Sequence, residues 1–489
     1  MVLELVAVRL LVPAFGNTTY LWTNVLGVTL LALSGGYYLG GRLADRQPVM
    51  RTVSSTIVLS GLFVALVPVL FPLVRAFIGE ASHGPMGGPL LTVVLLFFGP
   101  AALVGAISPM AVKLVSAAGA PVGKAAGLVS MFTALGSIVG TFATGFFLVP
   151  LAGSYKILAG VATALTVLGG IGLVLGRDRL TRAQVTLLVL AAASCVLSTI
   201  GGTDVAPGVL FDEETPYQRV LVYDGVQEHS LSGQRIRFLM LDTTLHGAMV
   251  LEGDRDALPL AYTRAIDLLE LFVPDAHAAA FVGGGTYTMP KRFLHGFTER
   301  RAEVYELDPV IVAVGQRFFG TRGLEGLVHR VGDARQLLRG SDRRFDLIFG
   351  DAYHSGRQVP FHLTTVEYYR IVKERLRLGG IYMTNIVSAA TGPRSGFFRS
   401  TLRTLQNVFP EVYVFAAGSD LRIPINLILV CPQVARGYSV SEIRERGRGT
   451  VMEPLTSAIV DPTHYVSAVD AAPVLTDDYG PVESIAIAQ

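Results

Sequence analysis

The sequence contains little cysteine and no concentrated basic surface. Only two cysteines occur among its 489 residues, Cys195 in an apolar run and Cys431 in a predicted strand. Two isolated cysteines give neither a disulfide framework nor the paired spacing of a zinc site, so we expect buried free thiols and no metal. No basic cluster is interleaved with aromatic residues, and we therefore expect no nucleic-acid partner.

Charge is also scarce. Charged residues make up 16% of the chain and hydrophobic residues 51%, with a mean hydropathy of +0.50. These values are too apolar for an ordinary soluble protein, and the length allows two or three domains. Residues 1–200 contain 11 Lys/Arg and 4 Asp/Glu, whereas the remainder contains 29 and 34. A weakly charged, basic part is thus joined to an ordinary, slightly acidic part.

The first part, residues 1–200, consists of apolar segments of membrane-spanning length. We expect seven of them, the first and last being short: 3–15, 21–40, 53–72, 90–110, 125–149, 155–175 and 184–200. Glu4 and Arg9 lie within the first segment, and we expect them to pair with other helices. No basic region precedes the apolar run, so we expect no cleavable signal peptide. The pattern predicts a multi-pass α-helical domain in the cell membrane, with the lipid bilayer as a partner.

The second part begins after a polar linker at 201–216, which contains Gly and Pro. Residues 217–275 contain alternating runs at 218–223, 235–241 and 248–251, which predict a small antiparallel sheet, and then a helix over 258–272. Residues 276–489 alternate strands with helices, which predicts a parallel, doubly wound, Rossmann-like α/β sheet. Its predicted strands are 278–283, 302–307, 328–332, 345–350 and 380–386, its helices 290–297, 310–318, 364–376 and 395–408, and its closing antiparallel pair 411–417 and 426–432.

A glycine turn follows the first strand of this predicted sheet. Gly283, Gly284 and Gly285 stand between the apolar run 278–282 and the start of a helix. In such a turn, backbone N–H groups approach a ligand closely. About twenty residues later the second strand ends in acids, where a nucleoside-binding sheet holds ribose hydroxyls. Together these features predict a nucleoside site.

Acidic residues follow the next three strands at their carboxyl ends. They are Glu306 with Asp308, then Asp333, then Asp351. Ligands of such sheets bind beyond the carboxyl ends of the strands, so we expect these acids to line one crevice. Asp308 and Asp333 also precede helices, and capping is their alternative role. We favour the cap for Asp308, ribose binding for Glu306, and binding of an adenine edge for Asp333 with Ala334.

These motifs resemble those of the spermidine synthases, the polyamine aminopropyltransferases. The matching residues are Tyr217-Gln218, Gly283-Gly284-Gly285, Glu306-Leu307-Asp308-Pro309, Gly332-Asp333, the run from Asp346 to Asp351, and the run from Leu378 to Thr384. The run from Leu475 to Glu483 and the hydrophobic first part resemble the membrane-fused branch of that family. The resemblance implies the Rossmann-like fold shared by class I methyltransferases and spermidine synthases.

The resemblance also implies a reaction, namely transfer of an aminopropyl group from decarboxylated S-adenosylmethionine to a putrescine-like amine. Asp351 would orient and deprotonate the amine, Tyr217 would close the amine site, and Tyr353 would contact the amine. The residues expected to hold the donor are Gln218, Gly283, Gly284, Gly285, Glu306, Leu307, Asp333 and Ala334. No permanently bound cofactor is expected, and a homodimer is implied because soluble relatives commonly dimerise.

Two positions depart from the family's pattern. Thr286 follows the glycine run and His354 lies three residues after Asp351, where the family usually has Asp. Both missing acids belong to amine recognition, so the acceptor or the transferred group is expected to differ. His354 is a candidate base at neutral pH, with an ordinary surface-loop histidine as the alternative. Asp477 and Asp478 are candidates to replace a lost acid, the alternative being a turn in which Asp478 bonds its own backbone.

Two other functions stay open. Thr286 and His354 favour a methyl or other transfer from S-adenosylmethionine, with a membrane-embedded acceptor. The segment 40–46 resembles a loop of major-facilitator transporters and favours a transporter or sensor that binds a nucleoside or polyamine without turnover. Retention of Asp351 together with Gln218 and Glu306 favours an enzyme.

The predicted orientation in the membrane conflicts with the number of segments. Basic residues in the loops near 40–46, 113–124 and 177–182 place the N-terminus inside. Seven crossings would then place everything after residue 200 outside, whereas a nucleoside-dependent enzyme is expected on the cytoplasmic side. Either the segment 3–15 or the segment 184–200 does not cross, or the orientation is wrong.

Overall fold

The computed structural model describes residues 1–46, 50–78, 87–176, 180–200, 208–226, 234–254, 257–295, 297–353, 359–482 and 485. These residues form two compact units. The first unit comprises Met1–Pro207 and Glu213–Pro216, and the second comprises Gly208–Asp212 and Tyr217–Gln489.

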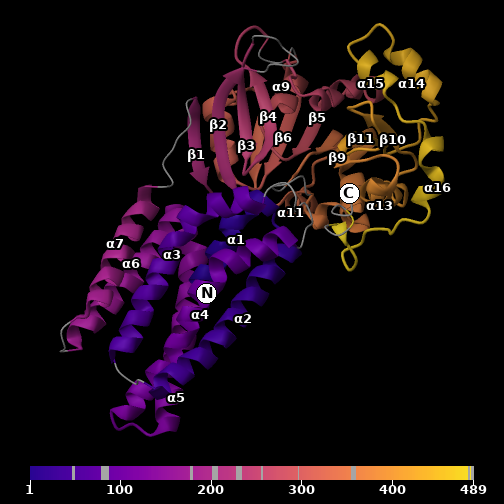
Figure 1. The fold of residues 1–489 in the computed structure, drawn as a ribbon. Helices are drawn as coiled ribbons and strands as arrows, with labels where there is room; N and C mark the ends of the chain where they lie inside the picture. Colours follow the sequence, from indigo (N-terminus) through magenta and orange to yellow (C-terminus); the bar gives the residue numbers. More distant parts are fainter. Residues whose placement is uncertain are drawn as a thin grey trace. The chain divides into compact units, whose positions relative to one another are not determined.

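The first unit is a bundle of apolar helices (Figure 1). Its α-helices are α1 (Val2–Phe15), α2 (Thr19–Arg46), α3 (Met50–Ile78), α4 (Gly87–Ala117), α5 (Val122–Ala143), α6 (Val149–Leu175) and α7 (Arg182–Ile200), and a π-helical turn, Thr144–Leu148, joins α5 to α6. Two glycines of α2 allow close contact with α4. A Cβ atom would lie 2.1 Å from the Ala102 carbonyl oxygen at Gly36, and 2.3 Å from that of Ala106 at Gly40. Small residues at these positions let the two backbones approach each other, as in membrane helix pairs.

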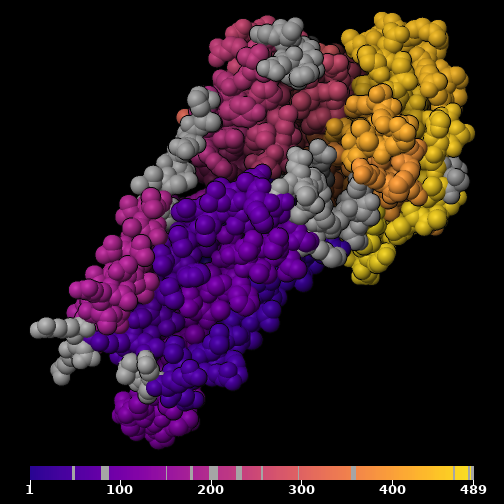
Figure 2. All heavy atoms as spheres, in the orientation of Figure 1, coloured from indigo at the N-terminus to yellow at the C-terminus, as the bar shows by residue number. Residues whose placement is uncertain are grey.

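Four helical stretches among the described residues are long and apolar enough to cross a membrane: Met50–Ile78, Gly87–Ala117, Val122–Leu148 and Leu151–Leu175. They coincide with four of the seven predicted segments. The other three predicted segments also lie in helices, α1, α2 and α7. The predicted loop at 40–46 was wrong, because it forms the last turns of α2. The surface of this unit, indigo to magenta in Figure 2, exposes large apolar side chains on most of its helices.

The charged residues of α1 have polar partners. Arg9 donates hydrogen bonds to the carbonyl oxygens of Thr215 and Pro216, the latter at 2.7 Å. Glu4 lies 3.5 Å from the chain's amino group. Arg9 therefore contacts the connecting segment 213–216.

The second unit begins with a small four-stranded sheet of order β1-β2-β3-β4. Its strands are β1 (Val209–Glu214), β2 (Arg219–Val226), β3 (Arg235–Leu241) and β4 (Thr244–Val250). The β2–β3 and β3–β4 pairs are antiparallel, as predicted. Strand β1 falls within the predicted linker, which is therefore not wholly irregular. A 3₁₀ helix, Ala261–Leu268, and the short α8 (Leu269–Phe272) stand where one helix was predicted.

A seven-stranded sheet forms the rest of this unit, in the order β10-β11-β9-β8-β5-β6-β7. Its strands are β5 (Ala278–Val282), β6 (Arg301–Glu306), β7 (Leu327–Val331), β8 (Phe345–Gly350), β9 (Leu376–Ser388), β10 (Tyr413–Ala416) and β11 (Ile425–Pro432). Strands β5 to β9 pair in parallel, and β11 pairs antiparallel with both of its neighbours. The predicted Rossmann-like sheet with a closing antiparallel pair is thus confirmed.

Helices accompany the strands along the chain. They are α9 (Thr288–Leu294), α10 (Pro309–Phe318), α11 (Ala334–Arg339), α12 (Val366–Arg375), α13 (Gly396–Gln406), α14 (Val440–Gly447), α15 (Glu453–Ser457) and α16 (Val466–Val469). The three helices after β11 were not predicted, and α11 was expected only in the alternative role of Asp333 as a helix cap. The short length of α11, six residues, explains why its periodicity was not visible in the sequence.

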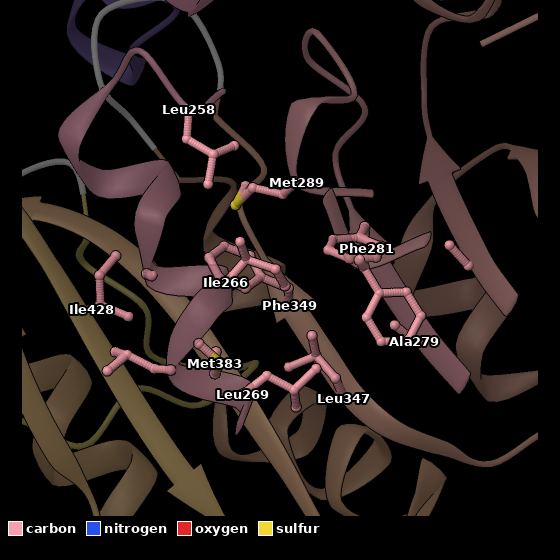
Figure 3. Close-up of a cluster of buried hydrophobic side chains, with 14 of the residues drawn as sticks. Leu258, Ile266, Leu269, Ala279, Phe281, Met289, Leu347, Phe349, Met383 and Ile428 are labelled. Atoms are coloured by element: carbon pink, nitrogen blue, oxygen red, sulfur yellow. The ribbon is translucent and has the colours of Figure 1, made fainter. Parts of the chain in front are cut away.

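Continuous apolar strands supply a core on each face of this sheet. Successive side chains of a strand point to opposite faces, so Ala279 and Phe281 enter one buried cluster while Ala280 and Val282 enter the other. Figure 3 shows the first cluster, in which Phe281 lies with Phe349, Met383, Ile266 and Leu269. Burial of both faces leaves the carboxyl edge of the sheet as the place for polar chemistry.

Candidate active site

A cavity of about 470 Å³ lies at the carboxyl edge of the seven-stranded sheet. The structure brings most of the predicted site residues into its lining: Tyr217, Gln218, Gly283, Gly284, Gly285, Glu306, Leu307, Asp333, Ala334, Asp351 and Tyr353. His354 lies outside the described residues. Asp477 and Asp478 are described but do not line the cavity. The crevice expected at the strand ends is therefore present, and the tail acids are not part of it.

The glycine turn after β5 is set by close contacts that exclude side chains. Gly283 has φ +99°, and a Cβ atom there would lie 2.6 Å from the carbonyl oxygen of Asp351. A Cβ atom on Gly284 would lie 2.9 Å from the Tyr287 hydroxyl and 3.1 Å from Glu306 Oε2. Glycine is needed at both positions, because the turn packs directly against the ends of β8 and β6.

Glu306, the last residue of β6, is held by two backbone groups. Its Oε2 accepts a hydrogen bond from the Gly284 N–H at 2.8 Å, and its Oε1 accepts one from the Asp308 N–H at 2.9 Å. Burial raises the pKa of this carboxyl above its usual range, and the two backbone hydrogen bonds oppose the rise. A carboxylate has about four acceptor positions, so Glu306 retains acceptor capacity for hydroxyl groups. Ribose binding by Glu306 stays a prediction.

Asp308 and Asp333 both cap helices. Asp308 Oδ1 accepts a hydrogen bond from the Val310 N–H at 2.9 Å, which confirms the predicted cap of α10. Asp333 Oδ1 accepts one from the Gln336 N–H at 2.9 Å, and its Oδ2 lies 2.8 Å from His362 Nε2. Asp333 therefore caps α11, which was its alternative role. Binding of an adenine edge stays a prediction, because Asp333 also lines the cavity.

Asp351 follows β8 and lies in a chain of hydrogen bonds. Its Oδ1 accepts from Asn385 Nδ2 at 2.9 Å, and the Asn385 side-chain oxygen accepts from Asn426 Nδ2 at 3.0 Å. The Tyr262 hydroxyl also hydrogen-bonds the Asp351 carboxylate. Tyr353 donates its hydroxyl to the Asn385 carbonyl oxygen at 2.8 Å. These contacts fix the carboxylate at the centre of the strand ends.

The surroundings of Asp351 tune its protonation. Burial raises the pKa of Asp351 to about 6, against the opposing hydrogen bonds from Asn385 and Tyr262. Burial and the nearby charge of Asp351 raise the pKa of the Tyr262 and Tyr353 hydroxyls well above the usual value. Both tyrosines therefore stay neutral donors, and Asp351 is the group suited to accept a proton near neutral pH.

Acidic side chains dominate the charge of the cavity lining. Its described lining contains four carboxylates, those of Glu306, Asp308, Asp333 and Asp351, and neither a lysine nor an arginine. A cavity with this lining favours cationic ligands. Among the described residues no group of three His, Cys, Asp or Glu is placed to hold a metal ion.

No family model matches the chain. A polyamine aminopropyltransferase of Vibrio vulnificus is 26% identical over 148 residues, which cover 30% of this chain and 48% of that protein. A probable polyamine aminopropyl transferase of Bifidobacterium longum is 22% identical over 315 residues, or 61% of this chain and 67% of that protein. The chain is similar in sequence to polyamine aminopropyltransferases. It spans about half the length of the Vibrio relative.

Among solved structures, a probable spermidine synthase from Corynebacterium glutamicum aligns with 56% of this chain and 96% of its own length. The sequence identity is 20% and the TM-score is 0.46.

The predicted acids of the C-terminal segment have a different partner. Asp477 receives two hydrogen bonds from the Arg335 guanidinium, at 2.7 and 2.5 Å, and one from the Thr365 hydroxyl at 2.8 Å. Asp478 lies in a turn in which Thr476 and Tyr479 exchange backbone hydrogen bonds. Amine binding by Asp477 or Asp478 therefore has no support from this geometry.

Thr286, which stands where the resembling family has Asp, lines the cavity with a buried side chain. It packs against Gly247 of β4, where a Cβ atom would lie 2.5 Å from the threonine Cγ2 and Oγ1. The position is therefore small, neutral and tightly enclosed.

Several lining residues were not predicted from the sequence, namely Tyr262, Asn385, Asn426, His246 and His362. Asn385 is a polar residue within the last four residues of the buried strand β9, close to the carboxyl edge at which Asp351 was found. No local signal marks Tyr262 or Asn426, because the fold brings them to Asp351 from positions 89 residues before it and 75 residues after it.

Proposed function

We propose that this chain is a membrane-integral aminopropyltransferase, which transfers an aminopropyl group from decarboxylated S-adenosylmethionine to an amine. One observation carries the proposal: the cavity has four carboxylates, including Asp351, and neither a lysine nor an arginine in its described lining. The sequence similarity to polyamine aminopropyltransferases supports it.

The charge of the lining favours the decarboxylated donor over S-adenosylmethionine itself. S-adenosylmethionine carries an α-carboxylate, which would need a cationic partner once it is removed from water. The described lining offers carboxylates instead. The decarboxylated donor carries only an ammonium and a sulfonium, and both are attracted by these acids. The alternative of methyl transfer is disfavoured on this ground.

Asp351 performs the proton transfer in the proposed reaction. Its carboxylate accepts a proton from the acceptor ammonium, and the freed nitrogen lone pair forms a bond to the methylene carbon beside the sulfonium. The bond from this carbon to sulfur breaks, and its electron pair returns to sulfur, so methylthioadenosine leaves as a neutral thioether. Tyr262 and Asn385 orient the Asp351 carboxylate.

The donor is assigned to the other half of the cavity. The glycine turn, Glu306 and Leu307 take the ribose side, Asp333 and Ala334 the adenine side, and Gln218 the remaining part. Tyr217 and Tyr353 border the amine. A homodimer stays an expectation from the family.

The membrane part of the proposal rests on helix lengths. Helix α1 has 14 residues and is about 21 Å long at 1.5 Å per residue, which is less than the hydrocarbon core of about 30 Å. The basic stretches near 40–46, 113–124 and 177–182 follow α2, α4 and α6 and lie on the cytoplasmic side whether or not α1 crosses. We therefore place α7, whose apolar stretch Arg182–Leu197 is among the shorter ones, as a segment that does not cross. The residues after 200 then stay on the cytoplasmic side, which removes the conflict between charge and span count.

The full chain in detergent, supplied with decarboxylated S-adenosylmethionine and a panel of amines, tests the reaction. Mass spectrometry should detect methylthioadenosine and an acceptor that has gained one aminopropyl group. Asp351→Asn should lower turnover by about 10²- to 10⁴-fold, with donor binding intact, whereas exposed Asp342→Asn should retain full activity. S-adenosylhomocysteine formed from S-adenosylmethionine would instead establish a methyltransferase. Donor binding without any product would establish a sensor.

A further inference from the structure

The cavity runs along the sheet from one charged end to one neutral end. In the order β7-β6-β5-β8-β9-β11, the acids follow β7, β6 and β8. Strand β11 is antiparallel to β9, so its first residues share an edge with the carboxyl end of β9. Beyond Asp351, the described lining on this side is uncharged: Asn385, Val387, Ala417, Pro424, Ile425 and Asn426.

The two amides on this side are oriented by Asp351. A carboxylate only accepts hydrogen bonds, so Asn385 directs its NH₂ group to Asp351 at 2.9 Å. The Asn385 oxygen then faces Asn426 and accepts from its Nδ2 at 3.0 Å. The Asn385 side-chain oxygen is therefore held toward Asn426. A second cation on this side would meet a neutral chain of amides and no carboxylate.

We propose that the acceptor carries a single ammonium, held by Asp351, and an uncharged remainder that lies along Asn385 and Asn426. The inference rests on the proposed aminopropyl transfer and names its substrate class as monoamines and amino alcohols. A hydroxyl at the far end both donates and accepts, so it suits the Asn426 side chain. The reaction is the same: the amine nitrogen gains the N–C bond, and Asp351 takes its proton.

The cost of a second ammonium follows from its burial. An ionised amine taken from water without a counter-charge is penalised far more than a hydroxyl with a hydrogen-bond partner. The other polar positions near the glycine turn do not offset that cost, because Thr286 is neutral and packed against Gly247, and His246 adds no negative charge. A diamine such as putrescine therefore gains nothing from its second charge.

Paired acceptors of equal length test the inference. With the full chain in detergent and decarboxylated S-adenosylmethionine as donor, kcat/KM is measured for putrescine and for 4-aminobutan-1-ol through the methylthioadenosine released. We expect the amino alcohol to be used at least as efficiently as putrescine. A preference for putrescine of tenfold or more would overturn the inference and leave aminopropyl transfer standing. No methylthioadenosine with any amine would overturn both.

A one-atom change at Asn426 gives a second, independent measurement. Asn426→Asp keeps the size of the side chain and adds a carboxylate on the neutral side, so the ratio of kcat/KM for putrescine to that for 4-aminobutan-1-ol should rise by about tenfold or more. Asn407→Asp adds the same charge at the exposed end of α13 and should leave the ratio unchanged. If the wild type and Asn426→Asp gave the same putrescine to 4-aminobutan-1-ol ratio, with donor binding intact, the side of the cavity that contains Asn385 and Asn426 would not select the acceptor's charge.

Discussion

At the scale of single residues, Asp351 combines two opposing influences. Burial favours its neutral form, whereas hydrogen bonds from Asn385 and Tyr262 favour its charged form, and the result is a pKa of about 6. A base with a pKa close to the working pH is mostly ionised and still accepts a proton readily. The same contacts hold the carboxylate in one orientation, so Asn385 and Tyr262 are positioning residues of the proposed reaction.

The pH dependence of the activity follows from this pKa. Asp351 accepts a proton only when it is ionised, so kcat/KM should fall about tenfold for each pH unit below about 6 and level off above it. Tyr262→Phe removes a hydrogen bond that lowers the Asp351 pKa, and the acid limb should therefore move to higher pH. The measurement is the pH profile of methylthioadenosine release, from which kcat/KM for the amine is obtained at each pH.

Tyr353→Phe is the matched control for the loss of a tyrosine hydroxyl. Tyr353 donates to the Asn385 carbonyl oxygen rather than to Asp351, so its removal should leave the midpoint of the acid limb in place. An equal displacement in both variants, or a wild-type profile with no acid limb near pH 6, would contradict the assignment of Asp351 as the base.

At the scale of elements, the C-terminal segment is tied through α11 to the end of the cavity that we propose for the donor. Asp477 binds the guanidinium of Arg335, whose Nη1 also donates to the His362 carbonyl oxygen at 3.0 Å. The His362 ring in turn pairs with Asp333. Arg335 also holds the pKa of Asp477 below its usual range, so the pair stays ionised at neutral pH. The segment therefore contacts the residues of the proposed donor site from outside the cavity.

Asp477→Asn should weaken donor binding more than turnover. Loss of the paired charge leaves the buried Arg335 side chain short of an acceptor and frees His362 and Asp333 to shift. We expect the KM for the donor to rise by about tenfold, the equivalent of about 1.4 kcal/mol, with kcat and the amine KM within about twofold, together with a lower Tm. Steady-state kinetics with each substrate varied in turn, and thermal unfolding in detergent, check these outcomes.

Asp478→Asn provides the neighbouring control. It removes one carboxylate from the same turn without touching Arg335, and it should leave all the kinetic constants unchanged. If Asp477→Asn raised the KM of the amine rather than that of the donor, the expectation from the sequence that these acids bind the amine would regain support.

At the scale of the whole molecule, the sequence was informative wherever a pattern is local. Short, mainly apolar buried strands such as β5 and β8, and the turn glycines after β5, can be recognised in the sequence, because their periodicity and φ requirements are local. The parallel sheet and the closing antiparallel pair followed from the alternation of elements. Tyr262, Asn426 and the partner of Asp477 were not predictable, because each depends on contacts between residues distant in the chain.

In the membrane part too, the sequence predicted local features but not contacts between distant residues. Lengths and hydropathy located the long apolar helices, whereas the contacts of Arg9 with Thr215 and Pro216 depend on the tertiary fold. Span counting from composition alone also left the side of the second unit undecided. That side depends on whether α7 crosses, because the basic stretches near 40–46, 113–124 and 177–182 lie on one side whether or not α1 crosses.

Helix α5 offers the sharpest test of membrane insertion. Only 6% of its apolar window is buried within the described structure, and its large side chains, including Phe132 at 66% exposure and Val139 at 65%, face outward. A contiguous apolar surface of this kind is not stable in water and requires lipid or another protein to cover it. Lipid should cover it if the chain crosses a bilayer.

A spin label at Phe132→Cys in liposomes measures what covers α5. The native Cys195 and Cys431 thiols are buried, so the introduced thiol is the one that reacts. We expect relaxation by oxygen to exceed relaxation by a water-soluble nickel chelate by about tenfold or more, because oxygen concentrates in the hydrocarbon core. Leu378→Cys, at an 88% exposed position near the start of β9 in the second unit, should show the reverse preference. Equal access of the nickel chelate at both sites would place α5 in water, and exclusion of both reagents at position 132 would place a protein partner there, so either result would refute insertion of this helix.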